Sequence, residues 1–318
     1  MDSQPVQHAE SEPGATDPHV LDGAAGNAVV TDVQTASTQS SQDSPSPHGS
    51  VEARPNGAFA VPDPAWTPSM PDRRTLSGEM WLVLWLSIAS AAISALLSLI
   101  KSLTEGVRLT DQSVTLVGTF VQDRPWLDVL YQITNIALPL VPVLLVLHLL
   151  RRSGEGRYAI GLDLRDWKWD VVKGVALASV IGGIGLVFYL LAYHLGMNVR
   201  IAAVSADHRW WTPILLVVSA LYNATLEEVI VLAFFVHRAR QIGWKPWAQV
   251  GGSALARASY HLYQGFGGFL GNLAMGGVFA ILYRRWNRVM PFLIAHFLID
   301  SVAFLGYYYL GGHVSWLP

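Results

Sequence analysis

Six ionisable residues stand out because they interrupt otherwise apolar stretches of the sequence. They are two adjacent glutamates, one arginine, two histidines and one aspartate: Glu227, Glu228, Arg257, His261, His296 and Asp300. Placing a charge inside a bilayer costs at least about 2.5–3.5 kcal/mol on insertion scales, so residues of this kind are functional candidates. A carboxylate with two imidazoles can activate water. Glu227 would act as general base, and the imidazoles would polarise the water, stabilise an oxyanion or bind a metal.

The spacing of these residues predicts that they gather in one region. Counted from the basic residues that border each stretch, Glu227, His261 and His296 lie about 12–20 Å deep on the same side. Glu228 points about 100° away from Glu227, so one carboxylate can face a cavity while the other pairs elsewhere. Three pairs are spaced by four residues and share a helix face: Asn223 with Glu227, Arg257 with His261, and His296 with Asp300.

Other chemistries are less well supported. The chain has no cysteine, which excludes thiolate catalysis, disulfides and cysteine-ligated metals. Ser259 is two residues from His261, so the two side chains point apart on a helix. Two alternatives to a hydrolase stay open on spacing alone: a transporter whose Glu and His side chains relay protons or ions, and a set of purely structural hydrogen bonds.

The elements that must position these residues are apolar spans. A helix needs about 20 apolar residues to cross a bilayer, and the sequence predicts seven spans, with an eighth open, in an all-α bundle. Val114–Val121 is too short to cross and is expected at the interface. Most tryptophans fall at or near span ends, as expected for the headgroup region. The predicted spans are Trp81–Ile100, Leu130–Leu150, Val171–Leu195, Trp211–Val236, Ala248–His261, Gly267–Tyr283 and Val289–Leu310.

Composition separates two parts of the chain. Of 318 residues, 52% are hydrophobic and only 14% are charged, with a mean hydropathy of +0.34. Residues 1–70 carry nine acids and one base, and residues 1–72 are rich in Ser, Gln and Pro, which predicts a disordered acidic tail before a membrane domain at 73–318. With the tail in the cytoplasm, fourteen bases lie inside and five outside, which predicts a cytoplasmic N-terminus and an external C-terminus.

Three sequence islands resemble the CPBP family of intramembrane proteases, which includes type II CAAX prenyl endopeptidases and bacteriocin-processing or Abi-like proteins. The islands are EEVIVLAFF (227–235), ARASYHLYQG (256–265) and AHFLID (295–300), and the resemblance extends over about 160–310. By this resemblance, Glu227 and His261 would activate water, Glu228 would orient the cluster, and His296 with Asp300 would form or support the oxyanion site. His261 and His296 are the candidate ligands if a metal is bound, and the resemblance leaves the cofactor open between zinc and none.

Two departures from the family pattern concern the charge balance. The arginine that follows the Glu pair in the family falls at Leu232 here, and the glycine after it is Ala233. Arg257 also stands where the family has an aromatic residue four positions before the histidine. Arg257 is the only base inside a predicted span, so we expect it to supply the missing guanidinium to Glu228 or Glu227, with Asn223 as a second supporting residue. The loss of the family arginine leaves an inactive scaffold as an alternative.

The sequence therefore predicts an intramembrane endopeptidase, with metal dependence open. Its expected partners are a peptide or protein C-terminus, CAAX-like by resemblance, and membrane lipid. Nothing in the pattern points to nucleic acid. The expected location is a membrane, the plasma membrane by preference, with the N-terminus in the cytoplasm.

Overall fold

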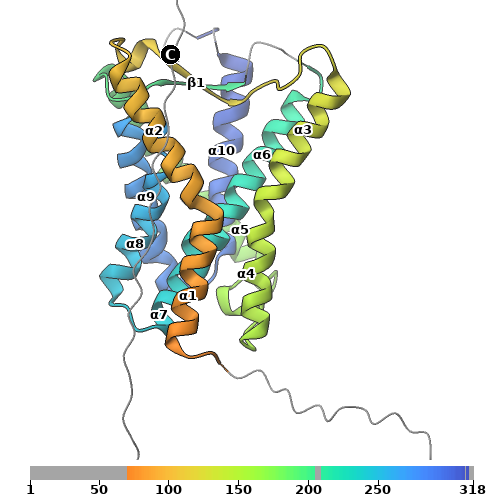
Figure 1. Cartoon of the computed structure of the whole chain (residues 1–318), viewed down its shortest axis with the longest axis vertical. Coiled ribbons are helices and arrows are strands. Elements are labelled where there is room, and N and C mark those ends of the chain that lie inside the picture. Colours follow the sequence, from red (N-terminus) through yellow and green to blue (C-terminus); the bar gives the residue numbers. More distant parts are fainter. Residues whose placement is uncertain (1–69, 205–208, 312, 315–318) are drawn as a thin grey trace, which may run out of the picture. The chain divides into compact units, whose positions relative to one another are not determined.

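The computed structural model describes residues 70–204, 209–311, 313 and 314. The predicted tail lies outside this range except for its last three residues, and the bounds 1–72 stay a prediction. Asp72 caps the first helix by accepting hydrogen bonds from the backbone N–H groups of Arg74 and Thr75 at 2.7 and 3.0 Å. The described residues are mainly helical, as Figure 1 shows, and the all-α bundle is confirmed.

Six helices in the described residues are long and apolar enough to cross a membrane. Three of them are built from three consecutive elements each, and the other three are single helices. They are Arg73–Thr104 (α1 Arg73–Leu84, η1 Trp85–Ala89, α2 Ser90–Thr104), Pro125–Arg152 (α3 Pro125–Ala137, η3 Leu138–Leu140, α4 Val141–Arg152), Trp167–His194 (α5), Thr212–Gln241 (α6 Thr212–Leu226, η5 Glu227–Phe234, α7 Phe235–Gln241), Phe266–Trp286 (α9) and Met290–Leu310 (α10).

The fifth predicted span, Ala248–His261, is a shorter helix followed by a turn. α8 covers Pro246–Ser259 and η6 covers Leu262–Gln264, so the helix ends two residues before His261. The turn reaches the end of α5, where Val199 donates a backbone hydrogen bond to Gln264 at 3.2 Å and Asn198 pairs with Gly265. α8 thus begins soon after α7, and η6 reaches the segment that follows α5. Figure 1 shows α8 next to α9.

A small parallel sheet joins two connections at the end of α5. β1 (Ser113–Val117) pairs with β2 (Arg200–Val204), from Ser113–Arg200 to Val117–Val204. The segment predicted to lie at the interface, Val114–Val121, thus forms most of a strand. Its apolar and β-branched residues suit a strand, but the partner strand lies far along the sequence, so periodicity alone could not identify the pairing.

The helix that carries the two glutamates lies at the centre of the bundle. All eight residues of η5 are buried, whereas α5 buries only three of its 28 residues and exposes a long series of large apolar side chains. An exposed apolar surface of this size is typical of contact with lipid. The burial pattern therefore separates a lipid-facing helix from the central one.

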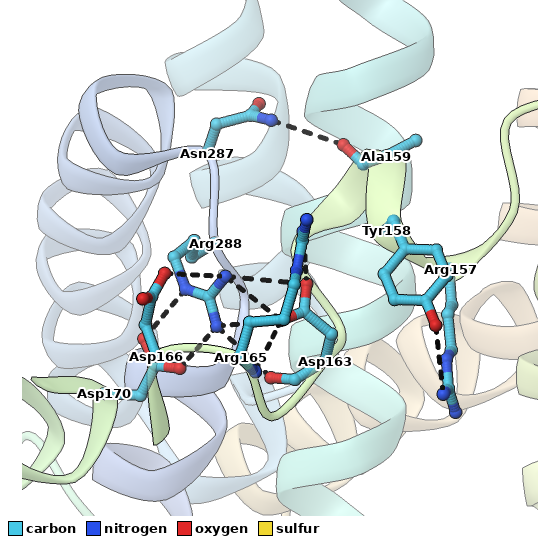
Figure 2. A network of polar contacts seen from close by, with 9 residues as sticks. All are labelled: Arg157, Tyr158, Ala159, Asp163, Arg165, Asp166, Asp170, Asn287 and Arg288. Carbon is cyan, nitrogen blue, oxygen red and sulfur yellow. Dashed lines mark hydrogen bonds and ion pairs between the residues drawn. The ribbon is translucent and has the colours of Figure 1, made fainter. Parts of the chain in front are cut away.

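A loop at the start of α5 is held to the start of α10 by one arginine. Arg288 forms ion pairs with Asp163 at 3.2 Å, Asp166 at 3.4 Å and Asp170 at 2.6 Å (Figure 2). Gly161 adopts a φ of +67°, and a Cβ there would lie 2.3 Å from the Cα of Arg288, so only glycine permits this contact. The hydrogen bond from Arg165, together with Arg288, holds the pKa of Asp163 well below its usual range although burial opposes this.

Candidate active site

The predicted site residues meet inside the bundle from four elements, α6, η5, α8 and α10, and from the turn after α8; Asn223 lies on α6. Glu227 and Glu228 begin η5, which is a π-helix: the Phe235 N–H donates to the carbonyl of Ile230, five residues earlier. π-helical turns are rare and occur often at functional sites. Arg257 lies on α8, His261 follows α8, and His296 lies on α10.

Arg257 is the shared partner of both glutamates. Its Nη2 contacts Glu228 Oε1 directly and lies 3.1 Å from Glu227 Oε2. The arginine is 2% exposed and Glu228 is 0% exposed, so the pair is shielded from solvent. The expected ion pair is thereby confirmed, and Arg257 contacts both carboxylates rather than one.

His296 completes this buried group from α10. Its Nδ1 lies 2.7 Å from Glu228 Oε1 and donates to it, since a carboxylate only accepts. Its Nε2 lies 3.5 Å from Asp300 Oδ2, and the same oxygen accepts a hydrogen bond from Asn223 Nδ2 at 3.3 Å. The structure therefore connects Glu228, His296, Asp300 and Asn223 in one chain of contacts.

His261 faces the other glutamate. Its Nδ1 lies 3.0 Å from the carbonyl of Arg257, so this nitrogen carries the hydrogen and donates. The opposite nitrogen, Nε2, lies 3.9 Å from Glu227 Oε1. The predicted helix ends before His261. The hydrogen bond from Nδ1 to the Arg257 carbonyl holds the ring in position instead.

The two glutamates consequently have different surroundings. Glu228 is enclosed by Arg257 and His296. The side chains of Glu227, His261 and Asp300 keep 10%, 13% and 20% exposure, more than that of Glu228. Glu227, His261 and Asp300 therefore form the less enclosed side of the cluster.

The residues present do not fit a metal site. The described residues contain no group of three or more His, Asp or Glu side chains arranged to hold a metal ion. The guanidinium of Arg257 lies against both carboxylates, where a cation would otherwise bind. The hydrogen bonds of His261 and His296 to Arg257 O and Glu228 would suit metal ligands, so the misfit lies in the absence of a third ligand among the described residues and in the position of Arg257.

Two features of the site could not be read from the sequence. Ser253 of α8 donates a hydrogen bond at 2.7 Å to the carbonyl of Val231, in the π-helical segment. The Tyr260 ring lies 4.8 Å from the His261 ring, centroid to centroid, and supplies an aromatic neighbour. A serine among small apolar residues and a tyrosine beside a histidine carry no distinctive spacing, so no sequence signal identified either.

The fold and the cluster define a polytopic helical membrane protein with a Glu–Arg–His site inside its bundle. Residues 209–302 match the family model described as Rce1-like, type II CAAX prenyl endopeptidase. This segment contains all seven residues of the cluster, from Asn223 to Asp300, and it confirms the resemblance to CAAX-type intramembrane proteases over these residues. The match implies a peptide substrate and a membrane environment. No curated protein and no solved structure matches the chain.

Proposed function

We propose that the protein is an intramembrane endopeptidase that cleaves a peptide or a CAAX-like C-terminus near the cytoplasmic leaflet. The observation that supports this best is the gap of 3.9 Å between Glu227 Oε1 and His261 Nε2. This gap is too long for a direct hydrogen bond and short enough for one water oxygen to contact both groups. A water molecule between these two side chains could give its proton to the carboxylate of Glu227.

In the proposed reaction Glu227 takes a proton from this water as its oxygen attacks the scissile carbonyl carbon. The carbon–nitrogen bond then breaks, and the proton passes from Glu227 to the leaving amine. The water thus supplies the hydroxyl of the new carboxyl group and the hydrogen of the new amine. His261 positions the water through Nε2, because its Nδ1 is committed to the Arg257 carbonyl.

The negative charge that develops on the carbonyl oxygen requires hydrogen-bond donors. His296 and Asn223 carry N–H groups on either side of Asp300, at 3.5 and 3.3 Å from its Oδ2. In this proposal the second N–H of Asn223 and the Nε2–H of His296, whose contact with Asp300 is long, supply those donors, and Asp300 orients both side chains. Arg257 and His296 hold Glu228, which serves as a positioning residue.

The test is cleavage by the purified full chain in bilayer nanodiscs, with a C-terminal peptide library as substrate. Glu227→Gln keeps the size of the side chain but removes the base, and we expect cleavage to fall by about two to four orders of magnitude. Glu105→Gln is the matched control, since Glu105 is exposed and pairs only with Lys101 among the described contacts. Its activity should equal that of the wild type.

Double variants separate one catalytic unit from independent contributions. His261→Ala should lose activity, and adding it to Glu227→Gln should lose little more, since residues that act together are non-additive. Unchanged cleavage by a folded Glu227→Gln protein would contradict the proposal. Full additivity of the two substitutions would show that His261 does not act with Glu227.

A further inference from the structure

A second concave site lies away from the cluster, where the loop before α5 meets the start of α10. It consists of two adjoining cavities of about 520 and 390 Å³, which share Leu164 and Met290 as lining residues. We call them together the interfacial cavity. Its polar part is lined by Arg157, Tyr158 and Arg165, and its apolar part by Trp167, Val171 and Ile294.

The polar part presents two guanidiniums on one aromatic ring. The Cζ atoms of Arg157 and Arg165 lie 5.3 and 5.1 Å from the centroid of the Tyr158 ring, as expected for cation–π contacts. Arg157 forms no ion pair with any acid in the described part of the chain, and its side chain lies apart from the Arg288 cluster in Figure 2. Guanidiniums of this kind bind phosphate oxygens.

The acids nearby cancel only part of this charge. Asp163 accepts hydrogen bonds from Arg165 at 2.8 and 2.9 Å and from Arg288 at 3.2 Å, so these two arginines share one acid and Arg157 has no acid partner among the described ion pairs. Asp166 and Asp170 also pair with Arg288. The region holds five bases and three acids: Arg157, Arg165, Lys168, Lys173 and Arg288, with Asp163, Asp166 and Asp170. The two lysines lie over tryptophan rings.

The apolar part continues along the outer side of the bundle. Leu164 and Trp167 are 70% and 54% exposed. Leu164 lies in the loop just before α5 and Trp167 is its first residue, and the exposed surface of α5 is largely apolar. An exposed tryptophan next to lysines is typical of the membrane–water interface. An occupant of both cavities must therefore carry an anionic end and an apolar end.

From this combination we propose that the interfacial cavity binds an anionic glycerophospholipid. The phosphate contacts Arg157 and Arg165, and one acyl chain lies along Leu164, Trp167 and Ile294. The proposal concerns a lipid site separate from the candidate active site, and it does not rest on the proposed function.

The experiment measures lipid binding to the purified full chain in neutral detergent, by titration and by native mass spectrometry. The probes are dioctanoyl phosphatidylglycerol, dioctanoyl phosphatidylcholine and inorganic phosphate. We expect phosphatidylglycerol to bind at least about tenfold more tightly than phosphatidylcholine, since two basic side chains each favour an anionic lipid. Inorganic phosphate should compete only weakly because it lacks the acyl chains.

Two variants locate the site. Arg157→Gln with Arg165→Gln should remove the preference for phosphatidylglycerol. Arg151→Gln with Arg285→Gln removes the same charge from exposed residues that do not line the cavity, and should keep the preference. Arg157→Gln alone breaks no described ion pair, so it reports on binding without disturbing the loop.

Several results would overturn the proposal. Equal losses in the two double variants would show diffuse electrostatic attraction without a site. Equal binding of both lipids would exclude recognition of the headgroup, and full displacement by phosphate at the same concentration as lipid would show a free-anion site. Displacement of the lipid by a prenylated peptide that is itself cleaved would assign the cavity to substrate. Leu164→Ser removes apolar surface without adding charge, so it should weaken lipid binding without changing phosphate binding, and the reverse result would also contradict the proposal.

Discussion

Two buried carboxylates share one guanidinium in this protein. Arg257 contacts Glu228, lies 3.1 Å from Glu227, and comes from a different helix than either. Removing one member of a buried ion pair leaves an uncompensated charge, which costs about 3–5 kcal/mol. The position one turn after the glutamates, which carries the arginine in the resembled family, holds the buried and uncharged Leu232.

Replacing this arginine is therefore predicted to destabilise the protein and abolish cleavage. We expect Arg257→Leu to lower the free energy of unfolding by about 3–5 kcal/mol, measured by thermal denaturation in detergent. Adding Leu232→Arg should recover part of the stability and part of the activity, because it returns a guanidinium to the glutamates from the adjacent turn.

The control for this prediction is Leu232→Arg alone. It places a larger side chain at the buried Leu232 position while Arg257 already pairs with both carboxylates, so it should destabilise the wild type through overpacking, although it stabilises the Arg257→Leu background. If Arg257→Leu keeps wild-type melting and activity, the carboxylates are balanced in another way and the predicted role of Arg257 is wrong.

The helix that carries the two glutamates shows which features of the candidate site could be predicted from the sequence and which could not. The clustering of these residues and the ion pair of Arg257 were predictable because so few charges lie inside apolar stretches. The π-helical turns of η5 were not, since Glu227–Phe234 has the composition of an ordinary buried helix. The same holds for the division of roles between Glu227 and Glu228, which depends on which neighbour each side chain meets after packing.

The contact between α5 and α10 depends on one glycine. A Cβ at Gly174 would lie 2.6 Å from Cγ2 of Ile294 and 3.0 Å from the carbonyl oxygen of Pro291. We expect Gly174→Ala to cost about 1–3 kcal/mol of stability through overpacking, seen as a lower Tm. Gly183→Ala lies on the same helix with nothing within 4 Å of its added Cβ, and should melt as the wild type does. If both variants have the same Tm, the added Cβ at Gly174 does not strain the contact between α5 and α10, and the prediction is wrong.

At the scale of the whole molecule, six long helices and the connection through α8 and η6 support seven passages between the two faces of the bundle. Together with the excess of bases on one side, this predicts a cytoplasmic N-terminus and an external C-terminus. Reporter fusions at residues 70 and 318 should give signals on opposite sides of the membrane. Signals on the same side would contradict the seven-passage arrangement.

The order in which the site residues are synthesised has a consequence for membrane insertion. Arg257 follows Glu228 by 29 residues and His296 follows it by 68. At 5–20 residues per second, the ribosome needs about 1.5–6 s to supply the arginine and about 3–14 s to supply the histidine. During this interval an ionised Glu227 or Glu228 has no partner to offset its insertion cost of at least about 2.5 kcal/mol. Stable insertion of the central helix therefore depends on helices that the ribosome has not yet made.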